Sequence, residues 1–251
     1  MALYKSMLVA KTDLRMALKV SYVKYGLIGI AALGPIMMIA IVGFMVLADP
    51  LYAVFFLPSL SALMSPMLGM MAIMPAALIS ANALVGEREQ NTLEPLLNTP
   101  LTDRELLMGK LLSSFIPSFG LLLGSILVTE IATIIILLSV GAPIVLVPGL
   151  PGLFLLLTAG PTMIIAIVSV MILISGKVKR VYEAYQTSGA SILIFMIPMM
   201  LPIFTLEGSG AVDMNSVWVT NIITFLIALI LAAVTWALAI RRFNRDTMIS
   251  M

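Results

Sequence analysis

The sequence predicts an all-α membrane protein of six transmembrane helices, preceded by an amphipathic helix at the membrane interface. Three observations predict this fold: an apolar composition, six long apolar stretches and a one-sided distribution of basic residues. Of the 251 residues, 61% are hydrophobic and 10% are charged, and the mean hydropathy is +1.16. Because soluble domains carry about 25% charged residues, most of the surface of this chain is expected to face lipid.

The lengths of the apolar stretches fit a bilayer. A helix needs about 20 apolar residues to cross about 30 Å of hydrocarbon, and its backbone polar groups must be satisfied within the helix. Six stretches are long enough, at 26–48, 60–84, 112–139, 150–175, 188–206 and 217–240. In the fifth, Pro198 and Pro202 are expected to kink or break the helix, so it is either a short span or a re-entrant pair.

The basic residues orient these spans. All 14 lysines and arginines lie before the first stretch, between the second and third, between the fourth and fifth, or after the sixth. The intervening segments 49–59, 140–149 and 207–216 contain none. By the positive-inside rule, both termini and the two charged loops are expected in the cytoplasm, as in a multi-pass protein of the plasma membrane.

The first 25 residues predict a helix that lies in the headgroup plane and enters the first span at a bend near Gly26. One helical stripe carries the apolar side chains Leu3, Met7, Ala10, Leu14 and Leu18. The opposite side carries Lys5, Arg15 and Lys19. The alternative is a cytoplasmic extension of the first span.

The absence of cysteine and histidine excludes several kinds of chemistry. Disulfides and thiolate metal sites are excluded, as are zinc sites, Ser-His triads and histidine proton relays. An intramembrane enzyme lacks support, because no paired carboxylate or Ser-base arrangement accompanies the one carboxylate well inside a span. The 20 methionines are scattered and are interpreted as packing residues. We therefore expect no catalytic residue, no metal site and no nucleic-acid partner.

That carboxylate is Glu130, in the third span. An ionised carboxylate near the middle of a bilayer costs about 2.5–3.5 kcal/mol, so Glu130 is expected to face the bundle interior or water. One interpretation is a cation or substrate contact along a transport pathway. The other is a hydrogen-bonded interhelical residue, bonded to Thr129 or Thr133, or a residue near the outer interface.

Other polar and small residues inside the spans predict helix packing. Hydrogen bonds between helices are expected at Asn82, Thr220, Asn221 and Thr224. Close helix approach or kinks are expected at Gly69, Gly120, Gly124 and Gly160.

The loop 85–110 between the second and third spans predicts two helix starts. Asn91 or Thr92 can cap a helix of barely two turns, with Leu93, Leu96 and Leu97 on one face. A helix this short is marginal by itself, so a partner protein, the ends of the spans or the membrane surface must cover the leucines. Thr102-Asp103-Arg104-Glu105 then forms a capping box that begins the third span.

Residues 86–110 read G-E-R-E-x-x-T-L-E-x-L-L-x-x-P-L-x-x-x-E-L-L-x-G-K. This segment resembles the signature of the ABC-2 family of ABC transporter permeases. The resemblance implies a type V exporter-like fold, in which the segment between spans two and three is the coupling region that sits on an ATPase subunit. It implies a coupling surface formed by Glu87, Arg88, Glu89, Thr92, Leu93, Glu94, Leu96 and Leu97.

The ATPase itself is not expected in this chain. No G-x-x-x-x-G-K-[ST] is present, so ATP and Mg²⁺ would be bound by separate partner subunits. The resemblance implies two such ATPase subunits and a second permease, either another copy or a homologous chain. Several relatives close the outer gate with helices between spans five and six, whereas only the short segment 207–216 separates them here. Either these gate elements are reduced, or the stretch around Pro198 and Pro202 supplies them.

The leading hypothesis is the permease subunit of an ATP-driven transporter, an exporter that works by alternating access. The alternative is a secondary transporter or a membrane scaffold that needs no ATP. Secondary transporters often contain two related halves with broken helices, and the interrupted fifth span has no convincing counterpart in the first half. An apolar pathway suggests hydrophobic or amphiphilic cargo, although ion export through Glu130 is the competing interpretation.

Overall fold

The computed structural model describes residues 2–81, 85, 102–175, 178, 181–205 and 213–242. Within these ranges the chain is helical and contains no strand, as predicted. The elements are α1 (Ala2–Lys19), α2 (Ser21–Ala48), α3 (Pro50–Ala81), α6 (Asp103–Ser139), α7 (Leu150–Ser175), α8 (Val181–Met199), the 3-10 helix η2 (Leu201–Thr205) and α9 (Met214–Arg242).

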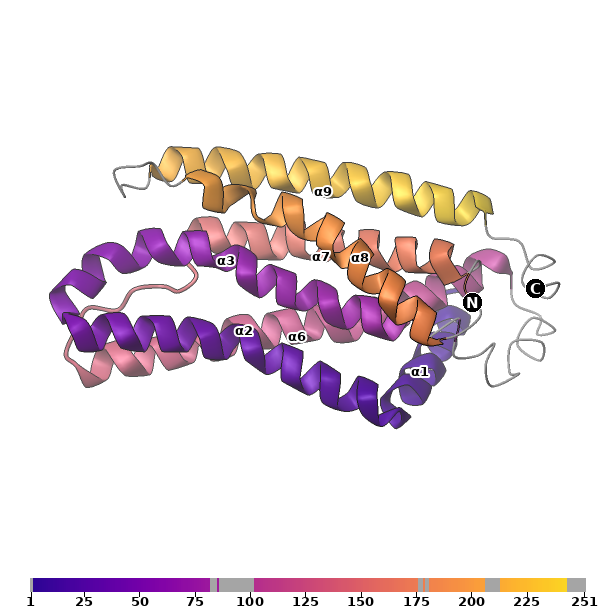
Figure 1. The fold of residues 1–251 in the computed structure, drawn as a ribbon, viewed down its shortest axis with the longest axis horizontal. Coiled ribbons are helices and arrows are strands. Elements are labelled where there is room, and N and C mark those ends of the chain that lie inside the picture. The colour runs from indigo at the N-terminus through magenta and orange to yellow at the C-terminus, as the bar shows by residue number, and fades with distance from the viewer. Residues whose placement is uncertain are drawn as a thin grey trace.

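The long helices run side by side and α1 lies across one end of them (Figure 1). At that end α6 begins and α9 finishes, so the basic residues of α1, α2, α6 and α9 gather there. We call it the basic end and the opposite one the far end. The basic clustering expected from the sequence is therefore present in the fold, while the side of the membrane that it faces stays a prediction.

Helices α3 and α7 form the centre of the bundle. Helix α3 packs against α2, α6, α7 and α8, and α7 packs against α3, α6, α8 and α9. Their contact faces are fully buried, as at Ile73, Ala76 and Leu155. The outer helices instead expose large apolar side chains, such as Phe44 on α2 and Ile230 on α9. Exposed apolar faces around a buried centre are what a bundle surrounded by lipid requires.

The structure confirms five of the six predicted spans. In the described part of the chain, five helical segments are long and apolar enough to cross a membrane: Val23–Ala48, Leu63–Ala81, Asp103–Ser139, Leu150–Ser175 and Met214–Arg242. The predicted fifth span, 188–206, corresponds to most of α8 followed by η2. Helix α8 falls short because its first half is polar, with Glu183, Gln186 and Thr187, and because the α-helix ends at Met199, directly after Pro198.

The chain turns between α1 and α2 at Val20 rather than near Gly26. Val20 has an extended backbone, with φ −76° and ψ 113°, so the two helices meet at an angle there. Gly26 lies inside α2. Helix α1 is thus shorter than the 25 residues expected for the interfacial helix, and α2 begins earlier than the predicted first span.

Two of the four predicted polar contacts join different helices. Asn221 Nδ2 donates to the carbonyl of Pro151 on α7 at 2.8 Å, and Thr224 Oγ1 donates to the carbonyl of Pro198 on α8 at 3.2 Å. Thr220 donates to its own helix instead, and Asn82 lies outside the described residues.

Close helix approach is confirmed at two of the four predicted glycines. A Cβ on Gly160 would lie 2.9 Å from Leu122 Cδ2, and one on Gly69 would overlap the end of Met199. At Gly120 and Gly124 nothing lies within 4 Å, so close approach is not the reason for those two.

Candidate functional site

The start of α6 is fixed by a capping box, as the sequence predicts. Glu105 N donates to Thr102 Oγ1 at 3.3 Å, and Thr102 N donates to Glu105 Oε2 at 2.9 Å. These bonds satisfy two backbone N–H groups that have no partner within the helix. The polypeptide that arrives from the predicted coupling segment is therefore joined to α6 through a defined first turn.

The same turn of α6 holds α1. Ser6 Oγ donates to the carbonyl of Glu105 at 3.0 Å, which links residues 99 positions apart in the chain. Leu106 and Leu107 follow and are almost fully buried, with exposed fractions of 1% and 2%. Polar and apolar contacts thus begin together, within a turn of the capping box.

Gly109 lets the two helices approach closely. A Cβ at this position would lie 2.8 Å from Val9 Cβ and Cγ1 and 3.0 Å from the carbonyl oxygen of Ser6. Val9 Cβ and the Ser6 carbonyl oxygen are fixed to the backbone of α1, so they cannot move aside as the end of a flexible side chain can. Only glycine fits here without a shift of α1 relative to α6.

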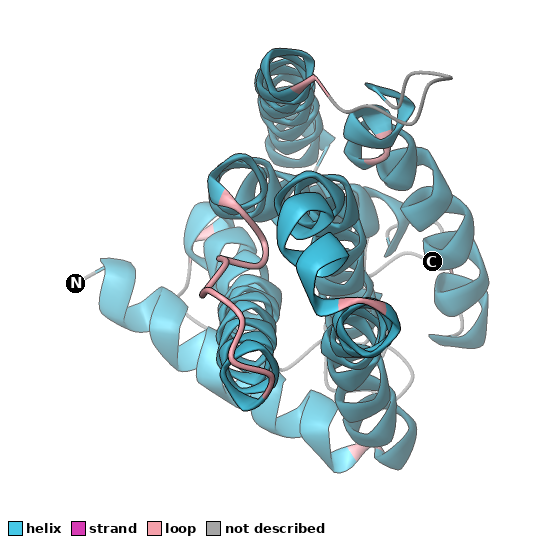
Figure 2. Cartoon of the chain, turned by 90° about the vertical axis from the view of Figure 1, so that its left-hand side faces the viewer, coloured by secondary structure: helices cyan, strands magenta, loops and turns pink. Residues whose placement is uncertain are grey.

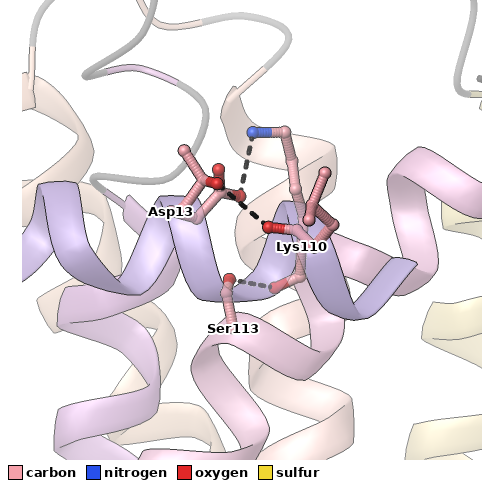
Figure 3. Close-up of polar contacts among 5 residues, drawn as sticks. Asp13, Lys110 and Ser113 are labelled. Carbon is pink, nitrogen blue, oxygen red and sulfur yellow. Dashed lines mark hydrogen bonds and ion pairs between the residues drawn. The ribbon is translucent and has the colours of Figure 1, made fainter. Parts of the chain in front are cut away.

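One turn of α1 beyond Val9, Asp13 forms a buried ion pair with Lys110 of α6. Lys110 Nζ lies 3.4 Å from Asp13 Oδ2, and the side chains are only 1% and 2% exposed. Figure 3 shows the lysine side chain extending toward the carboxylate on α1, while Ser113 Oγ donates to the backbone carbonyl of Lys110 at 2.8 Å. Because an isolated buried charge is costly, the pairing of opposite charges favours the burial of both side chains between α1 and α6.

These contacts form one continuous junction, which we call the α1–α6 junction: Ser6, Val9 and Asp13 on α1 with Glu105, Gly109 and Lys110 on α6. It combines a hydrogen bond, a close backbone approach and an ion pair along less than three turns of α6. Such a junction resists both sliding and separation of the two helices. Force applied at the start of α6 would be shared with α1.

The predicted amphipathic stripe of α1 is only partly buried in the protein. The face of α1 that is buried in the structure is formed by Ser6, Val9, Ala10, Asp13 and Ala17. Of the predicted stripe, Ala10 is buried and Leu14 is half-buried, whereas Met7 and Leu18 are 51% and 41% exposed. Leu3 has no described side chain. Exposed apolar residues beside the packed face are consistent with a helix that contacts both the bundle and the headgroup layer.

Sequence reasoning missed the partnership of Asp13 with Lys110, although one signal pointed to it. Asp13 is the only acidic residue among the first 48, in a segment rich in lysine and arginine. The sequence pattern used Lys110 only as one of the basic residues that orient the spans by the positive-inside rule. A lone acid on the face that carries Val9 and Ala17 could have been interpreted as the partner of a buried base.

The coupling residues predicted from the resemblance lie outside the described residues. This applies to the whole set Glu87, Arg88, Glu89, Thr92, Leu93, Glu94, Leu96 and Leu97. The described chain resumes at Thr102, so the final part of the quoted motif, from Glu105 to Lys110, is the part that forms the α1–α6 junction.

Glu130 lies far from this junction, toward the other end of α6. Its Oε2 accepts a hydrogen bond from the backbone N–H of Val147 at 2.9 Å, in the segment that connects α6 to α7. Its Oε1 is buried and makes no hydrogen bond within the described part of the chain. Thr129 and Thr133 donate to carbonyls of α6 itself. Glu130 thus ties a connecting segment to its own helix.

Comparison with known proteins places the chain in a family. The family model described as "ABC-2 family transporter protein" matches residues 10–216, which is most of the chain. No curated protein matches it. The chain belongs to the ABC-2 family of transporter proteins.

Proposed function

We propose that this chain is the permease subunit of an ATP-driven ABC transporter, an exporter that moves its substrate by alternating access. ATP and Mg²⁺ would be bound by two separate ATPase subunits, and a second permease, identical or homologous, would complete the pathway. Membership of the ABC-2 family supports a transport role. The five apolar helices support a multi-pass position in the membrane, which we propose is the plasma membrane, with both termini in the cytoplasm.

The observation that carries the proposal is the position of the α1–α6 junction directly after the predicted coupling segment. Residues 86–101 lead into the capping box at Thr102 and Glu105, at the basic end. By the positive-inside rule this end faces the ATP-containing compartment. An ATPase that presses on Glu87, Glu89 and Glu94 would therefore act on the first turn of a 37-residue helix.

The junction gives this push a route into the bundle. Because Gly109 and Lys110 hold α1 against α6, the two helices would move as one body. Helix α1 leads through Val20 into α2, and α2 packs against both α3 and α6. Movement at the coupling segment would thus reach the helices at the centre of the bundle, as alternating access requires.

The direct experiment is purification of the chain from its native membrane, followed by reconstitution with any ATP-binding protein that accompanies it. Co-purification of an ATPase, with ATP-dependent movement of a substrate from a panel of drugs, lipids, peptides and cations, is the expected result. A chain that purifies alone and transports without ATP would instead be a secondary transporter. One that purifies alone and transports nothing would be a scaffold.

A further inference from the structure

The segment that connects α6 to α7, residues 140–149, folds back over the far end of the bundle instead of forming a free loop. We call it the strap. Gly141 has φ +71°, a left-handed conformation suited to glycine, and Ala142 N donates to the carbonyl of Leu137 at 3.0 Å. The chain therefore reverses direction immediately after α6. Figure 2, viewed onto the far end, shows the strap running across that end from one helix to the next.

Two side chains from different helices hold the strap. Glu130 Oε2 on α6 accepts from Val147 N at 2.9 Å, and Ser61 Oγ on α3 accepts from Gly149 N at 3.3 Å. A bond from a backbone N–H to a carboxylate is among the stronger hydrogen bonds. The strap is thus tied to α3 and α6 at positions two residues apart.

The end of the strap nearest to α7 is inserted into the bundle. Val147 is fully buried and Pro148 is buried too. Val147 lines a small hollow together with residues of α2 and α3: Met38, Ile41, Val42, Leu57, Leu60, Ser61 and Met64. Val147 therefore forms the wall of this hollow that comes from the strap.

The start of α7 is shaped to accept the strap. A Cβ on Gly152 would lie 2.8 Å from Pro148 Cβ and 2.8 Å from Ser65 Cβ. Glycine at this position allows the strap and α3 to meet at the first turn of α7. Four helices, α2, α3, α6 and α7, consequently converge on residues 147–149.

We propose that the strap is the far-end closure of the protomer, with Glu130 as the positioning residue that holds it shut. Separation of α3 from α6 at the far end requires release of Val147 or Gly149, since one bond goes to each helix. The short segment 207–216 then need not supply the closure. The idea that the ATP cycle drives this release rests on the proposed function. The closure itself does not depend on that function and can be tested on the isolated chain.

The test measures access to the hollow beneath the strap. The chain has no cysteine, so a single Leu57→Cys substitution, at a residue 1% exposed on the wall of the hollow, serves as a specific reporter. The protein is reconstituted in lipid nanodiscs, where both faces are open to water, and treated with a charged maleimide. In the otherwise native chain we expect slow labelling. Adding Glu130→Ala should accelerate it at least tenfold.

Glu130→Gln is the matched control, because its amide oxygen can still accept from Val147 N, and labelling should stay slow. Ser139→Cys, at an exposed position at the end of α6, should label rapidly in all three backgrounds and shows that the reagent reaches the far end equally in each. Equal labelling of Leu57→Cys in the Ala and Gln variants, or rapid labelling in the native background, would overturn the proposal.

A second variant keeps the proposal testable if Glu130→Ala does not fold. A Cβ on Gly149 would lie 3.7 Å from Ser61 Oγ, so Ser61→Cys with Gly149→Cys should form a disulfide under mild oxidation. In a complex with its ATPase, this disulfide should abolish transport, and reduction should restore it. Full transport in the oxidised form would refute the strap as the closure, whereas absence of any ATPase partner would refute the proposed function and leave the labelling result to decide on the strap.

Discussion

Asp13 on α1 and Lys110 on α6 form an ion pair of 3.4 Å in which both side chains are almost completely buried. The pair lies at the point where the predicted coupling segment gives way to a long membrane helix. Buried pairs contribute little net stability compared with apolar residues of similar size, but removal of one partner leaves an uncompensated charge. This asymmetry makes the pair a sensitive probe of the α1–α6 junction.

We expect Asp13→Leu or Lys110→Met alone to lower the free energy of unfolding by about 3–5 kcal/mol. The double variant should lose less than the sum of the two single losses, because each single variant already removes the same ion pair. Thermal unfolding of the purified chain in detergent provides the measurement. Single variants as stable as the native chain would mean that the pair is not formed.

Gly109→Ala should destabilise the same junction by steric overlap. The added Cβ would meet Val9 and the backbone of Ser6, and overpacking of this kind costs about 1–3 kcal/mol. Gly120→Ala on the same helix is the control, since nothing lies within 4 Å of its Cβ position. The control should be as stable as the native chain or slightly more so. Equal effects at the two sites would argue against close contact at Gly109.

Asn221→Ala should weaken the packing of α9 on α7. The substitution removes the donor to Pro151 O and leaves a void at a fully buried site. Hydrogen bonds between membrane helices contribute about 0.6 kcal/mol on average, and lost packing adds to this. Asn215→Ala, at an exposed position at the start of α9, should have no effect in the same unfolding assay. A neutral Asn221→Ala would show that this bond does not hold the helices together.

Acid should weaken the start of α9. The Ser216 hydroxyl, followed by the Asn215 backbone N–H, donates to the Asp213 carboxylate and holds its pKa below the usual aspartate value of 3.8. Because the folded pKa is lowered, this stabilisation is complete above the ordinary pKa and is lost as pH falls through the lowered value. Asp213→Asn should remove this component from the pH dependence of unfolding below about pH 4. An unchanged acid profile in the variant would contradict the role of Asp213 as a cap.

The large features of the fold follow from sequence patterns because lipid imposes a simple requirement. Long apolar stretches and a clustered set of basic residues predicted five of the spans and the common basic end. The capping box at Thr102 was also predictable, because its bonds join residues only three positions apart. Helix α8 was harder, since the predicted apolar stretch 188–206 covers only its second half, and the helix begins in the polar residues that follow Val181.

Contacts between distant parts of the chain could not be predicted in the same way. The Asp13–Lys110 pair joins residues 97 positions apart, and the periodicity of α1 favoured the stripe with Met7 and Leu18 over the face that is actually packed. Glu130 was singled out as the one carboxylate well inside a predicted span. Its partner, the backbone N–H of Val147, carries no signature in the sequence, because every residue except proline has such a group.

Under the proposed function, an ATPase would drive this chain through the segment before the α1–α6 junction. The measurement is ATP-driven transport by the reconstituted complex, in two variants. The first carries both Glu87→Lys and Glu89→Lys, and the control carries Glu183→Lys, at an exposed acid on α8. We predict loss of the ATPase subunits, or ATP hydrolysis without transport, only in the first. Full coupled transport with both Glu87 and Glu89 reversed would show that the ATPase does not act through this segment.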